Sequence, residues 1–197
     1  MRMASFLKKK CLTLHTVAER KNVQLAQTAR HVSYIGNLKC GRYKTLIDIG
    51  KALSELRDEN VPNVIDVYSG TREFDCIEPL KKAPGINFCG EISAESVLEV
   101  MANSMAVIHT ESFEQEMMEL VRFSVSTKIA ESLMYGPCLI AYGPEGIASI
   151  DYLKENNAAY VISRPEDLEK GLEEILTNKE LRGADCKKCQ SIGVEKS

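Results

Sequence analysis

The sequence lacks any long apolar run. No stretch of its 197 residues approaches the ~18–20 consecutive apolar residues of a membrane span. The apolar part of residues 1–7, which precedes three lysines, is too short to form the core of a signal peptide. We therefore expect no membrane-spanning segment and at most peripheral contact with a membrane.

The sequence also lacks a large excess of charge of either sign, since its formal net charge is -3. Apart from the lysines at 8–10, basic residues are interleaved with acidic ones. A nucleic-acid backbone requires a continuous basic surface for binding. Nucleic acid is therefore not an expected partner.

The seven cysteines are odd in number and scattered along the chain, and several lie in apolar runs. Free thiols in such runs behave as small buried hydrophobic groups, which indicates a reducing, cytoplasmic location. Cys186 and Cys189 resemble half of a zinc site, but no second pair of Cys or His stands at a suitable spacing. We predict no metal site, and the role of this pair stays open.

The composition is ordinary for a globular protein, with 27% charged and 44% hydrophobic residues, which excludes long disorder, collagen-like repeats and a coiled coil. From residue 32 onward, short β-rich apolar runs alternate with segments of helical periodicity. The predicted strands are 32–36, 64–69, 86–90, 105–109, 138–142 and 159–162. The predicted helices are 42–57, 74–82, 93–103, 126–135, 149–156 and 165–177.

This alternation predicts an α/β fold, a doubly wound, Rossmann-like parallel sheet with helices on both faces. We expect a leader or a remnant of a preceding segment at 1–32, one Rossmann-like domain at 33–183 and a flexible tail at 184–197. Ligands bind such sheets beyond the carboxyl ends of the strands. The loops that follow residues 35, 88, 108 and 141 are therefore the places to look for a site.

A glycine loop that includes Gly36 and Gly41 follows the first predicted strand and opens a helix at Arg42. Backbone N–H groups at such a helix start attract an anion such as a diphosphate, and a guanidinium adds paired donors. The spacing resembles a phosphate-binding P-loop, but Arg42 and Tyr43 replace its Lys and Ser/Thr, so a nucleoside-triphosphatase is disfavoured. The alternative, that both glycines only shape a turn, stays open.

A second candidate site lies at the start of the predicted helix 126–135. Ser126 and Thr127 are suited to cap this helix, and Lys128 and Glu131 lie on one face of it at i and i+3. A lysine there suits a phosphate, and a carboxylate suits the vicinal hydroxyls of a ribose. The alternative is an ordinary surface ion pair.

Two further features lie at the same edge of the predicted sheet. The turn at Gly143 and Pro144 feeds another helix, so a second helix start is expected beside the first, as suits a diphosphate. His109 ends a predicted strand, where a structural role and contact with a sugar or base are equally compatible with the pattern.

Together these residues resemble the C-terminal, donor-binding domain of a GT-B fold, retaining glycosyltransferase (group 1, family 4-like) over roughly residues 33–183. The matching motifs are Tyr34-Ile-Gly-Asn-Leu with Arg42, Phe88-Cys-Gly90, His109-Thr-Glu-Ser-Phe113, Lys128-Ile-Ala-Glu131 with Gly136, and Ala141-Tyr-Gly-Pro144. The resemblance implies binding of a nucleotide sugar such as a UDP- or GDP-sugar, no cofactor or metal, and transfer with retention.

The resemblance also implies roles for individual residues. Gly36 approaches the distal phosphate, Arg42 binds the diphosphate and Glu131 holds the ribose. Asn37 stands where the family usually has Arg, with Arg122 and Lys128 as candidate substitutes. The expected catalytic residues are Arg42, Lys128 and Glu111, and the expected substrate-binding residues are Gly36, Asn37, His109, Ser112, Phe113, Thr127, Glu131, Gly143 and Pro144.

The implied function is transfer of a sugar to a saccharide or lipid-linked acceptor, as in polysaccharide biosynthesis. A complete GT-B enzyme has a second Rossmann-like domain for the acceptor, so we expect this chain to be the donor-binding half, inactive without a missing N-terminal domain or partner chain. The alternatives are a non-enzymatic nucleotide-binding or interaction module derived from such a half, and an unrelated nucleotide enzyme. No Gly-x-Gly-x-x-Gly follows any predicted strand, which disfavours the last.

Overall fold

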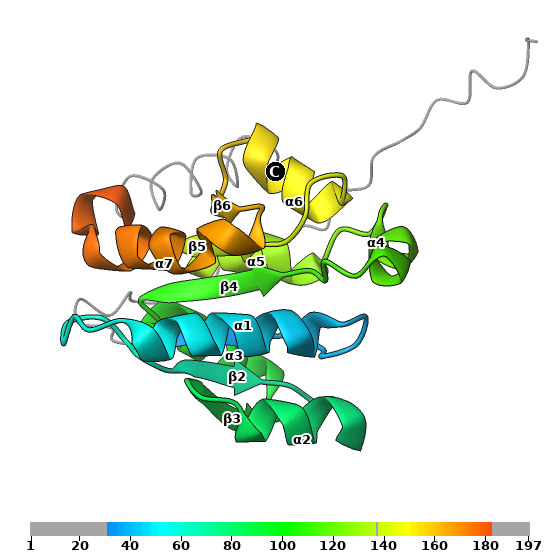
Figure 1. Ribbon diagram of the computed structural model, residues 1–197, viewed down its shortest axis with the longest axis horizontal. Coiled ribbons are helices and arrows are strands. Elements are labelled where there is room, and N and C mark those ends of the chain that lie inside the picture. Colours follow the sequence, from blue (N-terminus) through cyan, green and yellow to red (C-terminus); the bar gives the residue numbers. More distant parts are fainter. Residues whose placement is uncertain (1–30, 137, 183–197) are drawn as a thin grey trace, which may run out of the picture.

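The computed structural model describes residues 31–136 and 138–182. Most of the expected leader, the expected tail and the pair Cys186 and Cys189 lie outside these residues. A six-stranded, wholly parallel sheet in the order β3-β2-β1-β4-β5-β6 forms the centre of the molecule (Figure 1). The strands are β1 (Val32–Ile35), β2 (Ile65–Tyr68), β3 (Ile86–Gly90), β4 (Ala106–Thr110), β5 (Leu139–Tyr142) and β6 (Tyr160–Ile162).

Helices cover both faces of the sheet, as the predicted doubly wound fold requires (Figure 1). One face packs against α1 (Arg42–Glu55), α2 (Phe74–Lys82) and α7 (Leu168–Thr177). The other packs against α3 (Ala94–Asn103), α5 (Thr127–Tyr135) and α6 (Ala148–Glu155). The side chains of β4 are buried throughout, which explains its continuous apolar sequence before His109.

The predicted strands and helices are confirmed, with ends that differ by one or two residues. β1 includes Val32, one residue before the predicted domain range, and the last predicted helix begins with a 3₁₀ turn (Pro165–Asp167). Helix α4 (Gln115–Val121) lies in a segment for which the sequence pattern predicts no element. It buries only Val121, so it lacks the apolar stripe that marks a core-packed helix.

The strand order places β1 beside β4, and the chain leaves these two neighbours toward opposite sides of the sheet. Loops that leave in opposite directions open a crevice at the carboxyl ends of the strands, where ligands bind in sheets of this type. None of the helices in residues 31–136 and 138–182 is long and apolar enough to cross a membrane.

Candidate functional site

A pocket of about 260 Å³ lies at the carboxyl ends of β1 and β4, and the start of α5 also lines it. It therefore occupies the crevice between the two adjacent strands. The lining residues come from β1 and its loop (Tyr34, Ile35, Gly36, Asn37, Arg42), from β4 (Ile108, His109, Thr110) and from α5 with its cap (Ser126, Thr127, Lys128, Ile129, Ser132).

The loop after β1 is held in a tight conformation by its own polar groups. The Tyr34 hydroxyl donates to the carbonyl oxygen of Asn37 at 2.6 Å, and a side chain at Gly36 would meet that hydroxyl at 2.8 Å. The Asn37 side-chain oxygen accepts from the backbone N–H of Lys39 at 3.2 Å. Gly36 is therefore needed for the loop to fold over Tyr34, which supports the turn-shaping interpretation without excluding contact with a ligand.

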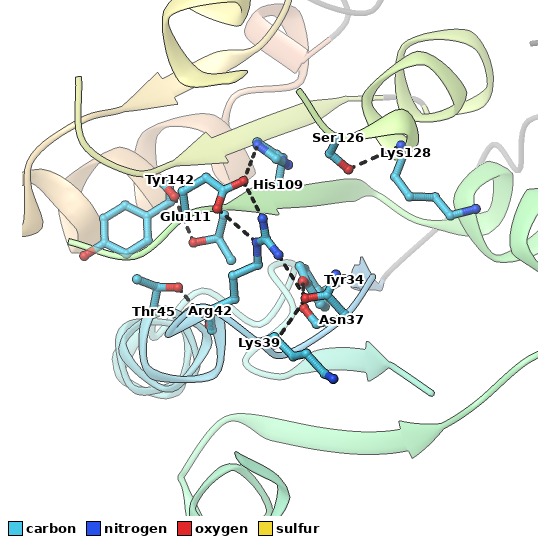
Figure 2. Close-up of polar contacts among 11 residues, drawn as sticks. Tyr34, Asn37, Lys39, Arg42, Thr45, His109, Glu111, Ser126, Lys128 and Tyr142 are labelled. Atoms are coloured by element: carbon cyan, nitrogen blue, oxygen red, sulfur yellow. Dashed lines mark hydrogen bonds and ion pairs between the residues drawn. The ribbon is translucent and has the colours of Figure 1, made fainter. Parts of the chain in front are cut away.

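Arg42 forms the central ion pair of the site with Glu111 (Figure 2). Its Nε donates to Glu111 Oε2 at 3.0 Å and its Nη2 to Oε1 at 2.9 Å, while Nη1 donates to Asn37 Oδ1 at 2.9 Å. The side chains of Arg42 and Glu111 are only 13% and 1% exposed. The carboxylate of Glu111 thus fixes the guanidinium in place. Both of its oxygens face Arg42, and Glu111 does not line the pocket.

The pKa of Arg42 and the pKa of Glu111 each depend on burial and on the charge of the other residue. Burial raises the pKa of Glu111, against the lowering effect of Arg42. Burial also disfavours the charged guanidinium, but hydrogen bonds and charge from Glu111 outweigh it and raise the pKa of Arg42. A guanidinium has five N–H groups, and these contacts use three of them. One N–H on each Nη is therefore left over from these contacts, and Arg42 is among the residues that line the pocket.

His109 lies beside this pair and is 9% exposed. Its Nε2 is 3.7 Å from Glu111 Oε1, a charge contact drawn as a dashed line in Figure 2. This distance is beyond that of a hydrogen bond, and Nε2 has no hydrogen-bond partner among the described residues. Burial, together with the positive charge of Arg42, lowers the pKa of His109 to about 3. The imidazole is therefore neutral at physiological pH.

The start of α5 confirms the predicted cap and the predicted helical pair. Ser126 is the N-cap, and its hydroxyl accepts from the backbone N–H of Lys128 at 3.3 Å. Lys128 Nζ donates to Glu131 Oε2 at 2.7 Å, with the two side chains 39% and 31% exposed. Lys128 and Glu131 thus form the surface ion pair that the sequence analysis names as the alternative. Such a partly exposed pair is weak enough for a ligand to compete with it. Of the two, only Lys128 lines the pocket.

The pocket brings together half of the expected site residues, namely Gly36, Asn37, Arg42, His109, Thr127 and Lys128. It does not include Glu111, Ser112, Phe113, Glu131, Gly143 or Pro144. Ser112 accepts from the backbone N–H of Glu114 at 3.1 Å, and Phe113 stacks on Tyr142 with ring centroids 4.9 Å apart. A side chain at Gly143 would meet Glu111 Cβ at 3.1 Å, so this glycine lets Glu111 approach Arg42.

The second helix start, after Gly143 and Pro144, therefore does not contribute to this pocket. Arg122 is also outside the lining and lies over the ring of Phe123 at 5.3 Å. Sequence reasoning missed Tyr34, Thr110 and Ser132, which line the pocket. Tyr34 and Thr110 stand at the carboxyl ends of adjacent strands, which was the one available signal for them. Within the described residues, no cluster of three or more His, Cys, Asp or Glu side chains is placed to hold a metal ion.

Comparisons with known proteins agree with this architecture. No family model and no curated protein matches the sequence. Among solved structures, WaaG, a glycosyltransferase involved in lipopolysaccharide biosynthesis, is similar with a TM-score of 0.63 and 17% identity over 88% of this chain and 44% of its own. A TarM variant from S. aureus in complex with UDP and other ligands is similar with a TM-score of 0.64 and 16% identity over 94% of this chain and 35% of its own.

A third structure, trehalose-6-phosphate synthase OtsA, is similar with a TM-score of 0.63 and 10% identity over 86% of this chain and 41% of its own. The chain thus spans between 35% and 44% of the lengths of these three proteins. At these levels of identity the comparisons concern the fold. The chain has the Rossmann-like fold of one half of a GT-B glycosyltransferase.

Proposed function

We propose that this chain is the donor-binding half of a glycosyltransferase, which binds a nucleotide sugar at the carboxyl edge of its sheet. The observation that carries the proposal is the pocket itself, in which Arg42, Lys128 and the N-terminus of α5 surround one cavity at the β1/β4 crevice. Fixed N–H donors beside a helix start form an anion site. A structurally similar protein, TarM, is described in complex with UDP, which supports a nucleotide as the ligand.

The two N–H groups of Arg42 that remain free suit two oxygens of a phosphate. Arg42 needs no rearrangement to offer them, because Glu111 already holds the guanidinium from its other side. Lys128 adds a mobile positive charge, and the first N–H groups of α5 add the positive end of the helix dipole. Charges fixed before the reaction stabilise the negative charge that builds on a departing nucleoside diphosphate.

Glu131 is proposed to bind the hydroxyls of the ribose. Its carboxylate is one turn along α5 from Lys128, outside the pocket lining but joined to Lys128 Nζ at 2.7 Å. A phosphate that draws Lys128 toward the pocket leaves the oxygens of Glu131 to accept from the two hydroxyls. Retention of configuration, a reaction without metal or cofactor, and an acceptor domain supplied by another part of the protein or by a partner belong to the same proposal.

Two further parts of the proposal are the saccharide or lipid-linked acceptor, which rests on the resemblance, and the cytoplasmic location, which rests on the cysteines. Cys40, Cys76, Cys89 and Cys138 are all free thiols in the structure, which is compatible with a reducing compartment.

Isothermal titration calorimetry with UDP-glucose, UDP-N-acetylglucosamine, GDP-mannose and ADP-glucose tests the proposal. We expect one of these to bind and Lys128→Ala to weaken its binding about tenfold or more, since a hydrogen bond to a charged group contributes roughly 1.5–3 kcal/mol. Lys154→Ala is the matched control, because Lys154 forms an exposed pair with Glu145 away from the pocket lining. Failure of all four compounds to bind, or equal effects of the two variants, would contradict the proposal. A stoichiometric protein complex without nucleotide binding would instead favour an interaction module.

A further inference from the structure

The charges around the pocket cancel. The two permanently cationic side chains of its lining are Arg42 and Lys128. Each is paired with a carboxylate, Glu111 for the first and Glu131 for the second. A nucleotide sugar carries a negative charge on each of its two phosphates. When it enters, the site gains negative charge that these balanced pairs do not neutralise.

His109 is the lining residue able to supply the missing positive charge. Its imidazole is neutral and buried, and its Nε2 has no hydrogen-bond partner among the described residues although Glu111 Oε1 lies 3.7 Å away. A proton on this ring makes both ring nitrogens donors. The charged ring is then attracted to the carboxylate of Glu111, 3.7 Å from Nε2, and to an anion in the pocket.

We propose that His109 takes up a proton when a nucleotide sugar binds, so that an imidazolium completes the anion site. This inference rests on the proposed function. His109 then acts as a binding residue whose charge exists only in the complex, and ligand affinity is linked to pH.

The other titratable groups that face His109 are unable to play this part. Tyr34 on β1, which lines the same pocket, is neutral, because burial raises the pKa of its hydroxyl. Arg42 on α1 and Lys128 on α5 already carry their charge. Protonation of Glu111 would remove a negative charge instead, at the expense of the ion pair that fixes Arg42. Burial and the charge of Arg42 hold the pKa of His109 low. A bound anion raises this pKa.

Calorimetry at neutral pH in PIPES and in Tris measures the protons taken up, because the two buffers have different ionisation enthalpies. The probe is whichever of the four nucleotide sugars named above binds, since the diphosphate of each does not titrate near neutral pH. We expect uptake of up to one proton per ligand, since the ligand must raise the pKa of His109 from about 3 past the pH of the assay, and an affinity that falls up to about tenfold for each unit of rising pH. Proton NMR of the His109 ring, assigned by its loss in His109→Gln, should show the imidazolium in the complex.

Two variants complete the test. His109→Gln keeps a polar group near the position of Nε2 but does not titrate, so its binding should be weaker and independent of pH. The matched control is His31→Gln, since His31 is 67% exposed at the opposite end of β1 and should leave proton uptake unchanged. Binding without proton uptake, or uptake with a His109 ring that stays neutral in the NMR spectrum, overturns the inference and leaves the proposed function standing. Failure of all four nucleotide sugars named under the proposed function to bind removes both.

Discussion

Replacing Glu111 with alanine should leave the guanidinium of Arg42 buried without its counter-charge. Arg42 is 13% exposed, cannot lose its proton at any ordinary pH and would forfeit two hydrogen bonds. Removal of one partner from a buried pair costs about 3–5 kcal/mol. At about 2–4 °C per kcal/mol for a domain of this size, the melting temperature should fall by roughly 6–20 °C.

The reverse variant, Arg42→Met, should behave differently with pH. It leaves Glu111 buried, but a carboxylate escapes by binding a proton, and burial already raises the pKa of Glu111. The folded state then holds a proton that the unfolded state releases. The variant should therefore regain stability as pH falls toward the ordinary carboxyl range, by up to about 1.4 kcal/mol per pH unit, and lose it again as pH rises.

Urea denaturation of Glu111→Ala, of Arg42→Met and of the variant that combines these two substitutions measures these terms as a double-mutant cycle. We expect the double variant to be more stable than Glu111→Ala, because it buries no unpaired charge. A loss below about 1 kcal/mol in Glu111→Ala, additive effects in the cycle, or an Arg42→Met deficit that does not shrink in acid would refute the reasoning.

Two other predictions concern residues around this pair. Burial lowers the pKa of His109 to about 3 in the folded protein, whereas the imidazole of the unfolded chain titrates at its ordinary pKa. Acid therefore favours the unfolded state. The contribution of His109 to stability is constant above the ordinary imidazole pKa and declines as the pH falls below it. Acidification from about pH 7.5 to about pH 5 should therefore destabilise the protein by about 2 kcal/mol relative to His109→Gln, as measured by urea denaturation at each pH. Gly41 has φ +74° and a side chain there would meet Ser112 Oγ at 2.5 Å, whereas Gly146 has φ +86° with nothing within 4 Å. Alanine at either position should lower the free energy of unfolding by about 1–2 kcal/mol because of the left-handed backbone. Gly41→Ala should lower it further, because its side chain contacts Ser112. Equal losses in the two variants would show that Ser112 moves aside freely.

The fold was open to prediction because its signals are local. Each strand is a short apolar run ended by a polar or small residue, and helices such as α3 and α5 begin at serines that cap them, Ser93 and Ser126. The exception is α4, an acidic segment with one buried side chain, where neither periodicity nor a capping side chain marks the helix. Parallel pairing then follows from the alternation of strands with helices.

The candidate site was predictable only where its signals are local as well. The pair of Lys128 and Glu131 is a matter of helical spacing, and the structure has it. The pairing of Arg42 with Glu111 joins residues 69 positions apart, and no local pattern indicates it. The same holds for Gly143, whose missing side chain makes room for Glu111. Roles that depend on close packing across the sheet edge are visible only in three dimensions.

This difference matters for how the site attracts an anion. From the sequence, Lys128 has a visible partner in Glu131, but Arg42 has none and counts as a free cation. In the structure Arg42 and Lys128 each pair with a carboxylate, so the affinity that these two side chains supply comes from directed N–H groups, beside the dipole of α5, rather than from their net charge. Screening by salt weakens exposed charges far more than buried hydrogen bonds. Binding of a nucleotide sugar should accordingly vary little with ionic strength through Arg42 and more through the exposed Lys128, so that Lys128→Ala flattens the salt dependence measured by calorimetry. An unchanged salt dependence in that variant would mean that Lys128 stays with Glu131 in the complex.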